Sequence, residues 1–236
     1  MTLNKIHIVV AGDSVSLRIR PPRCNSDEMT YAEHLQHMIP ESHIDHLGHG
    51  AKSIRYQLRD SDAFLRFFPD YYILNFGIVD ASSRSVPEFI FRFINHIPAK
   101  RYFIIEWKRK LFGLLELKFR RSLVLLRGQS SWTSEFEFRK KYADIIERIQ
   151  KETSSKIICL SINPTNKRVE EQLPGTTKKI EAYNLIIQEL CTNNNCHYID
   201  AKAIITEEML PDGIHYNAEG HRRIAIKIAD LIQKAN

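Results

Sequence analysis

Long apolar runs are missing from this sequence of 236 residues. No stretch approaches the roughly 18 consecutive apolar residues that a membrane-spanning helix needs. The apolar run from Ile6 to Ala11 is also shorter than the roughly 7–15 residues of a signal-peptide core, and it contains His7. We therefore expect a cytoplasmic protein with neither a signal peptide nor a transmembrane segment.

Cysteine is scarce, and its spacing carries no pattern. The four cysteines, at positions 24, 159, 191 and 196, form no C-x-x-C pair. An intracellular protein with reduced thiols is the simplest interpretation. Low-complexity tracts and internal repeats are also missing, and the composition is that of an ordinary globular chain. The length then suits one large domain or two small ones with a substantial core.

Signatures of nucleic-acid binding are absent as well. The sequence contains no helix-turn-helix, zinc-finger or RRM pattern. Its 34 Lys and Arg residues exceed its 28 Asp and Glu residues, which gives a formal net charge of +6. A charge of this size suits an anionic partner without requiring one, so we expect no nucleic-acid partner.

Much of the positive excess lies in residues 99–130, where basic and large apolar side chains are mixed. This composition predicts an insertion that forms one or two helices. A cap helix with a solvated basic face would explain it. A lid for an anionic substrate or glycan, a membrane-surface helix and a subunit contact would explain it equally well, so the sequence leaves all four open.

Short apolar segments alternate with helical patterns along the rest of the chain. Strands are predicted over residues 5–11, 42–47, 71–75, 156–162 and 197–200. Helices are predicted over 30–38, 51–68, 86–96, 135–153, 178–193 and 218–234. Because the strands are apolar on both faces, the pattern predicts an α/β fold, a three-layer α/β/α sandwich with a mostly parallel sheet of about five strands.

Ligands in such folds bind outside the carboxyl ends of the strands. Polar or glycine-bearing turns follow four of the predicted strands there, and they contain Ser14, the Gly48/Gly50 pair, Gly77 to Asp80, and Asn163.

Two motifs at opposite ends of the chain carry candidate chemistry. Gly12-Asp13-Ser14 follows the first strand, and Asp212 stands three residues before His215, just ahead of the last helix. A serine hydroxyl needs a base within hydrogen-bond reach to act as a nucleophile. One loop with both Asp and His can supply that base and the carboxylate that orients it. Taken singly, each motif also suits a helix cap or a polar loop.

Together the motifs resemble those of the SGNH hydrolases, the GDSL-type esterase and lipase family. Gly12-Asp13-Ser14-Val15 is similar to the nucleophile motif, and Asp212-Gly213-Ile214-His215 to the Asp-x-x-His motif. "HLGHGAKSIR" (46–55) resembles the second block of the family, and "ILNFGIVD" (73–80) resembles the third. The resemblance implies one SGNH/flavodoxin-like domain over residues 1–236, with catalytic Ser14, Asp212 and His215. It also implies oxyanion-hole N–H groups from Ser14 and Gly50.

The third block departs from the family pattern, because Val79 stands where the family has an asparagine. Valine has no side-chain donor for an oxyanion. Three outcomes are open. Another donor can replace the asparagine, with Arg84 as the candidate. Alternatively, the enzyme can be slow, or the protein can have lost hydrolysis and kept only binding. A salt bridge with Asp80 is an equally good interpretation of Arg84.

The block Gly-Ile-Val-Asp followed closely by arginine resembles a branch of the family met in bacterial surface-polysaccharide gene clusters. This likeness implies a carbohydrate-linked acyl group, most simply acetyl, as the substrate. We expect Asp80, Arg84 and Asn163 to contact it.

The expected function is therefore a serine esterase that removes an acyl group from a carbohydrate or a related small ester. If a sugar hydroxyl replaces water, the same triad performs O-acyl transfer. A catalytically impaired protein that binds a glycan or a partner in surface-polysaccharide assembly is the competing class. The sequence also holds five histidines between residues 34 and 49, but no Cys or carboxylate completes a recognisable metal-ligand spacing. We therefore expect neither a metal nor another cofactor.

Overall fold

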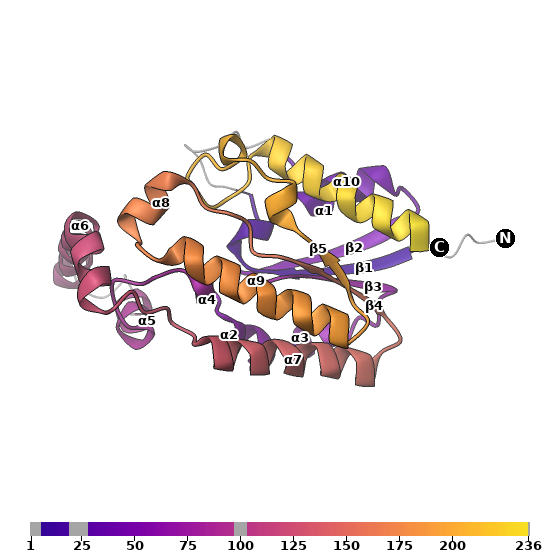
Figure 1. Cartoon of the computed structure of the whole chain (residues 1–236), viewed down its shortest axis with the longest axis horizontal. Coiled ribbons are helices and arrows are strands. Elements are labelled where there is room, and N and C mark those ends of the chain that lie inside the picture. The colour runs from indigo at the N-terminus through magenta and orange to yellow at the C-terminus, as the bar shows by residue number, and fades with distance from the viewer. Residues whose placement is uncertain (1–5, 19–27, 97–102, 236) are drawn as a thin grey trace.

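The computed structural model describes residues 6–18, 28–96 and 103–235 (Figure 1). The strands are β1 (Ile6–Gly12), β2 (Ser42–Gly48), β3 (Tyr71–Asn75), β4 (Lys156–Leu160) and β5 (His197–Ile199). The helices are α1 (Tyr31–Met38), α2 (Ile54–Arg59), α3 (Asp62–Leu65), α4 (Ile78–Ala81), α5 (Glu88–His96), α6 (Phe103–Leu126), α7 (Glu135–Glu152), α8 (Lys167–Gln172), α9 (Thr176–Asn193) and α10 (Ala218–Ala235). Short 3-10 helices are η1 (Ser14–Ser16), η2 (Ala201–Ala203) and η3 (Glu207–Met209).

The strands form one sheet in the order β2-β1-β3-β4-β5, and every neighbouring pair is parallel. Helices α1 and α10 cover one face, and α2, α3, α7 and α9 cover the other (Figure 1). The central strands β1 and β3 are apolar on both faces because both faces are covered, and Val9 and Ile73 are fully buried. The predicted three-layer fold with a parallel five-stranded sheet is confirmed.

The register of the sheet brings three turns together. Gly12, the last residue of β1, pairs with Gly48 on one side and with Asn75 on the other. The chain segments that follow β1, β2 and β3 therefore begin side by side at the carboxyl edge of the sheet. These segments carry Ser14, Gly50 and Val79.

The helix predicted over 51–68 is wrong in its extent, since two short helices, α2 and α3, occupy this range. Ala51 has a positive φ of 58°, which delays the helix start until Ile54. After α2 the Ser61 hydroxyl donates to the Leu58 carbonyl at 2.6 Å. Such a local bond competes with the helical ladder, and α3 begins at the next residue.

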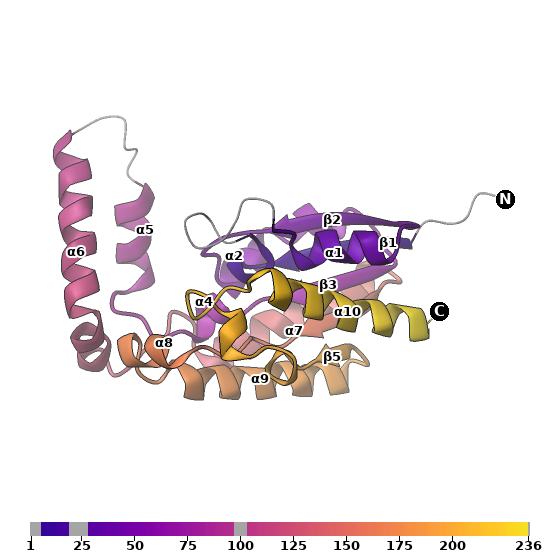
Figure 2. The same ribbon diagram turned by 90° about the horizontal axis from the view of Figure 1, so that it is seen from above.

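The basic apolar stretch predicted as a helical insertion contains α6, and residues 99–102 of it lie outside the described residues. Helices α5 and α6 project together from the layered body, at the end where the strands finish (Figure 2). Among the described residues, no helix combines the length and the apolar character needed to cross a bilayer. Cys159, Cys191 and Cys196 are free thiols, and Cys24 lies outside the described residues.

Candidate active site

Ser14 is the first residue of η1, a 3-10 helix of one turn that follows β1, and Asp13 caps this helix. One carboxylate oxygen of Asp13 accepts the Val15 N–H at 3.0 Å. The other accepts the N–H groups of Gly77 and Ile78 at 3.1 and 3.2 Å. Asp13 therefore holds the Ser14 turn and also ties it to the third block.

Burial raises the pKa of Asp13 to about 6, although the three amide hydrogen bonds oppose the rise. The backbone at Gly77 explains why those amides can reach the carboxylate. Gly77 has φ +128°, and a Cβ there would lie 2.6 Å from the Ile162 Cδ1 atom. Only glycine suits this turn.

Ser14 and His215 are 201 residues apart in sequence and in direct contact in the fold. The His215 Nε2 atom lies 2.9 Å from the Ser14 Oγ atom. On the other side of the ring, Nδ1 lies 2.8 Å from an Asp212 carboxylate oxygen. The side chains of His215 and Asp212 are 23% and 13% exposed. A hydroxyl, an imidazole and a carboxylate thus form a continuous hydrogen-bonded chain that solvent can reach at the surface.

The Asp212 carboxylate is strongly held in its ionised form. Burial disfavours the charge, but the His215 ring and the N–H groups of Ile214 and His215 outweigh it. Together they keep the pKa of Asp212 well below its usual value. Because the ionised Asp212 carboxylate accepts a hydrogen bond from Nδ1, the neutral imidazole carries its proton on Nδ1. Nε2 is then unprotonated and faces the Ser14 hydroxyl as an acceptor.

Gly213 makes the tight loop between Asp212 and His215 feasible. It has φ +90°, and a Cβ there would lie 2.3 Å from the Asn166 Oδ1 atom.

The prediction that Asn163 contacts substrate is corrected, because its side chain is buried and used internally. Its Nδ2 donates to the carbonyl of Ile214, next to His215, at 2.8 Å and to the Pro164 carbonyl at 2.9 Å. Asn163 therefore holds the loop that carries the imidazole.

Asn184, on α9, supports the same region. Its amide accepts the Ile162 N–H at 2.7 Å and donates to the Ile162 carbonyl at 2.8 Å. This pairing fixes the chain just before Asn163. No sequence signal marks the role, since an asparagine within a helix is commonly a surface residue.

Gly50 lies in the turn after β2, and a backbone bond anchors that turn to the Ser14 region. The His49 N–H donates to the Gly12 carbonyl at 3.0 Å. Gly50 is exposed, and a Cβ on it would meet no atom within 4 Å. Within the described part of the chain, neither the Ser14 N–H nor the Gly50 N–H donates a backbone hydrogen bond. Both amides can therefore serve an external acceptor.

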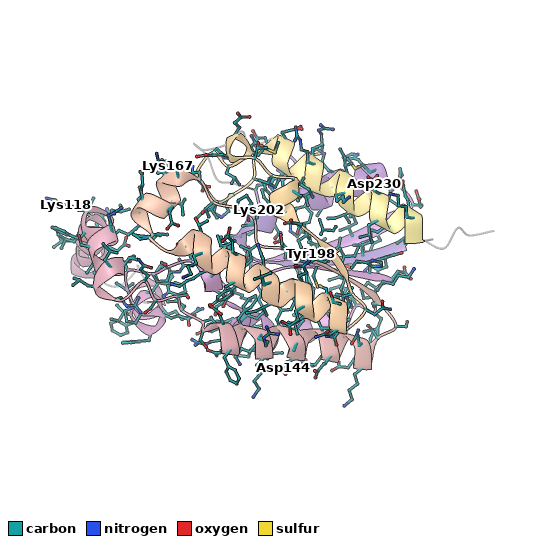
Figure 3. All side chains as sticks on the ribbon, viewed as in Figure 1. Lys118, Asp144, Lys167, Tyr198, Lys202 and Asp230 are labelled. Carbon is teal, nitrogen blue, oxygen red and sulfur yellow. The ribbon has the colours of Figure 1, made fainter. Side chains whose placement is uncertain are left out.

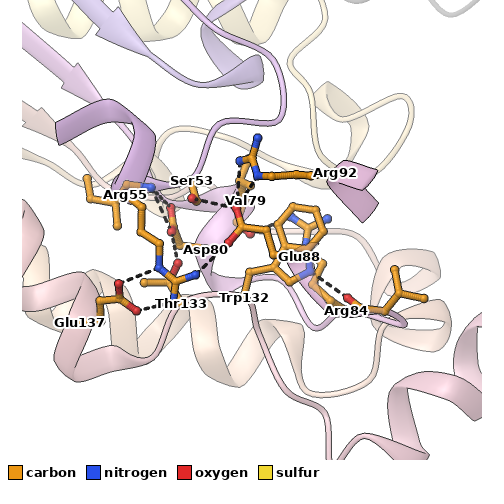
Figure 4. Close-up of polar contacts among 12 residues, drawn as sticks. Ser53, Arg55, Val79, Asp80, Arg84, Glu88, Arg92, Trp132, Thr133 and Glu137 are labelled. Carbon is orange, nitrogen blue, oxygen red and sulfur yellow. Dashed lines mark hydrogen bonds and ion pairs between the residues drawn. The ribbon is translucent and has the colours of Figure 1, made fainter. Parts of the chain in front are cut away.

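The prediction that Asp80 contacts substrate is also corrected. Asp80 is fully buried, and its carboxylate accepts the Ile54 N–H at 3.0 Å and the Thr133 hydroxyl at 2.5 Å (Figure 4). Burial raises the pKa of Asp80 to about 7 against these hydrogen bonds. The residue fixes the start of α2 and the loop before α7 instead of facing solvent.

Arg84 lies against the third block, but its partners differ from those expected. Its Nη2 donates to the carbonyl of Val79 at 2.7 Å, and its guanidinium stacks over the Trp132 ring at 4.2 Å (Figure 4). The salt bridge with Asp80 that the sequence allowed is replaced by these two contacts. Val79 is buried, and its apolar side chain has no donor to offer the site.

A groove with a volume of about 930 Å³ is lined from Lys52 onward, two residues after Gly50, and its lining includes none of Ser14, Asp212 and His215. Its walls come from the start of α2, from α5 and from the loop before α7, and they include Lys52, Tyr56, Arg92 and Trp132. Aromatic rings beside cationic side chains suit the apolar faces and hydroxyl groups of a sugar.

The described residues bring together one set of potential metal ligands, His7, His43 and Asp45. His7 Nε2 lies 2.7 Å from an Asp45 carboxylate oxygen, and His43 Nε2 lies 3.5 Å from it. These residues sit where β1 and β2 begin, at the opposite end of β1 from Ser14. The contact between His7 and Asp45 has the geometry of an ordinary hydrogen bond and needs no ion.

The chain resembles known proteins in sequence and in fold. The model of the GDSL-like lipase/acylhydrolase family matches residues 10–223. No curated protein matches the chain in sequence.

Several solved structures share the fold. A lipase/acylhydrolase from Enterococcus faecalis has a TM-score of 0.65 and 15% identity, covering 98% of this chain and 96% of its own. A carbohydrate acetylesterase family member from Sinorhizobium meliloti has a TM-score of 0.62 and 13% identity, covering 97% and 98%. A catalytic mutant of an acetylxylan esterase from Geobacillus stearothermophilus has a TM-score of 0.59 and 15% identity, covering 98% and 96%. Because the family model spans most of the sequence, the chain belongs to the GDSL-like lipase/acylhydrolase family, the SGNH serine hydrolases.

Proposed function

We propose that the protein is a serine esterase that removes an acetyl or similar acyl group from a carbohydrate or a related small ester. The single observation that carries the proposal is the chain of contacts from Ser14 Oγ through His215 to Asp212, at 2.9 and 2.8 Å. These are the distances over which a hydroxyl proton passes to an imidazole.

In the proposed mechanism, Ser14 Oγ attacks the ester carbonyl while His215 Nε2 takes the hydroxyl proton. Asp212 stabilises the imidazolium that forms. The N–H groups of Ser14 and Gly50 donate to the oxyanion of the tetrahedral intermediate. The C–O bond to the leaving alcohol then breaks, and His215 returns the proton to that alcohol. Water attacks the acyl-serine by the same general-base route, which releases the acid and restores Ser14.

The substrate class rests on the groove and on the solved structures of similar fold. The groove that begins at Lys52 offers aromatic and cationic walls. Two of the similar structures are described as a carbohydrate acetylesterase family member and an acetylxylan esterase. We therefore propose an O-acetylated sugar, such as a unit of a surface polysaccharide, and we assign Arg84 to contact it.

Replacing the nucleophile tests the proposal. The Ser14→Ala variant is expected to lose at least about a thousandfold in kcat towards p-nitrophenyl acetate and acetylated sugars. Ser122→Ala, at an exposed position on α6, is the matched control and should retain wild-type turnover. Turnover by Ser14→Ala equal to that of the wild type would remove Ser14 from the mechanism.

Val79 favours a second candidate, a protein that binds an acylated or anionic glycan with little hydrolysis. Loss of one oxyanion donor costs about 2.7–4 kcal/mol in a well-studied protease, so a site without the asparagine donor can be slow. Retained glycan binding without labelling by a fluorophosphonate probe would favour this candidate. Acyl transfer is distinguished by adding an acceptor sugar and measuring the acylated product.

A further inference from the structure

The outer face of α6 carries large apolar side chains where a solvated helix would carry polar ones. Six of them, Leu114, Leu115, Leu117, Phe119, Leu125 and Leu126, are each between 47% and 83% exposed. Single exposed leucines are common on protein surfaces, but six large apolar side chains exposed along one helix mark an interaction surface.

The charged residues on this outer face are all basic. Lys110, Lys118 and Arg121 are exposed among the leucines, and Lys118 lies at the opposite end of the molecule from Asp230 of α10 (Figure 3). Between residues 110 and 126, the acidic residue of α6 is Glu116. It points inward, accepts the Ser85 hydroxyl at 2.5 Å and pairs with Arg120 at 2.7 Å. The outer face is therefore apolar and cationic together.

The helical pair that carries this face is fixed to the catalytic body. Glu88, at the start of α5, pairs with Arg55 of α2 at 2.8 Å and with Arg92 at 2.9 Å (Figure 4). Arg55 also pairs with Glu137 of α7, through a bond of 2.6 Å from its Nε atom. Since α2 follows the Gly50 turn, these ion pairs hold the start of α5 against the element next to the proposed oxyanion hole. Helix α6 is tied to α8 by Arg121, whose Nη1 donates to the Glu171 carbonyl at 2.9 Å.

We propose that the outer face of α6 docks the protein on the surface of an anionic lipid bilayer. Leucine and phenylalanine side chains enter the boundary between headgroups and acyl chains, while the lysines and arginine contact lipid phosphates. A second copy of the chain is the poorer occupant, because symmetric pairing would set the cations of one copy against those of the other. This proposal concerns location alone, so it stands or falls independently of the proposed esterase activity.

Vesicle co-sedimentation tests the proposal directly. The full-length protein should sediment with vesicles made of equal parts phosphatidylglycerol and phosphatidylcholine, and much less with phosphatidylcholine alone. Binding should weaken as salt is raised, because exposed charges are screened. The double variant Leu114→Ser with Leu117→Ser should bind at least about tenfold more weakly, since it loses two apolar side chains from the face. Lys118→Glu with Arg121→Glu should do the same.

The matched control replaces apolar residues of similar exposure on the body. Phe136 on α7 is 79% exposed and Leu185 on α9 is 66% exposed. Phe136→Ser with Leu185→Ser should bind vesicles like the wild type. All variants are expected to melt near the wild-type temperature and to hydrolyse p-nitrophenyl acetate at the wild-type rate. Failure of the wild-type protein to bind anionic vesicles would overturn the proposal. Unchanged vesicle binding by the α6 variants would also overturn it. The same holds if the wild-type protein forms a dimer that only the α6 variants dissociate.

Discussion

Replacing Asp212 by asparagine probes how the carboxylate controls the imidazole. In the native site, one oxygen accepts the N–H groups of Ile214 and His215, and the other accepts the ring Nδ1–H. The asparagine oxygen must keep the two backbone bonds, so its NH₂ group faces Nδ1. The ring then carries its proton on Nε2 and cannot accept the proton of Ser14.

The expected cost follows from that tautomer. The same exchange lowers kcat by about 10⁴ in a well-studied serine protease, which corresponds to about 5 kcal/mol of transition-state stabilisation. Burst and steady-state assays with p-nitrophenyl acetate measure the loss. Asp230→Asn, an exposed change on α10, is the control and should leave kcat unaltered. The reasoning is refuted if Asp212→Asn keeps the wild-type melting temperature and loses less than about tenfold in kcat.

Three further predictions follow from single residues of the site. Val79→Asn adds a donor where the family has one, so kcat should rise about tenfold or more with KM little changed; a fall in kcat without unfolding would contradict this. Asn163→Ala frees the Ile214 carbonyl that it holds at 2.8 Å. Steady-state kinetics should show a lower kcat, and melting a stability loss of about 1–3 kcal/mol; full activity would contradict it. Asp80 has a folded pKa raised to about 7 from 3.8, so its contribution to stability is complete below about pH 4 and is lost as pH rises towards 7. The free energy of unfolding, measured in urea, should therefore fall with pH over this range, by up to about 1.4 kcal/mol per pH unit from Asp80. Asp80→Asn should remove this part of the pH dependence, and an unchanged pH dependence would count against the assignment.

The sheet and the triad geometry were open to prediction because each rests on a strong local signal. Runs of β-branched residues that are apolar on both faces require a sheet covered by helices. A serine after the first strand and an Asp-x-x-His before the last helix point to one edge of such a sheet. The structure confirms the fold, and it places His215 Nε2 2.9 Å from Ser14 Oγ.

The remaining features depend on contacts between distant segments, and no spacing rule encodes them. Turns from different parts of the chain set the amides of Gly77 and Ile78 that reach Asp13, and the asparagine that holds Ile214. Asp80 has the sequence context of a binding residue, yet the loop before α7 covers it. The mixed composition of residues 99–130 left four interpretations open until the exposure of individual leucines could be seen.

Active-site labelling with a fluorophosphonate probe, followed by peptide mass mapping, tests the central claim most directly. The account predicts one covalent adduct, on Ser14, that is absent from Ser14→Ala and forms far more slowly in Asp212→Asn. An adduct on a different serine, or esterase turnover by a protein whose Ser14 stays unlabelled, would contradict it.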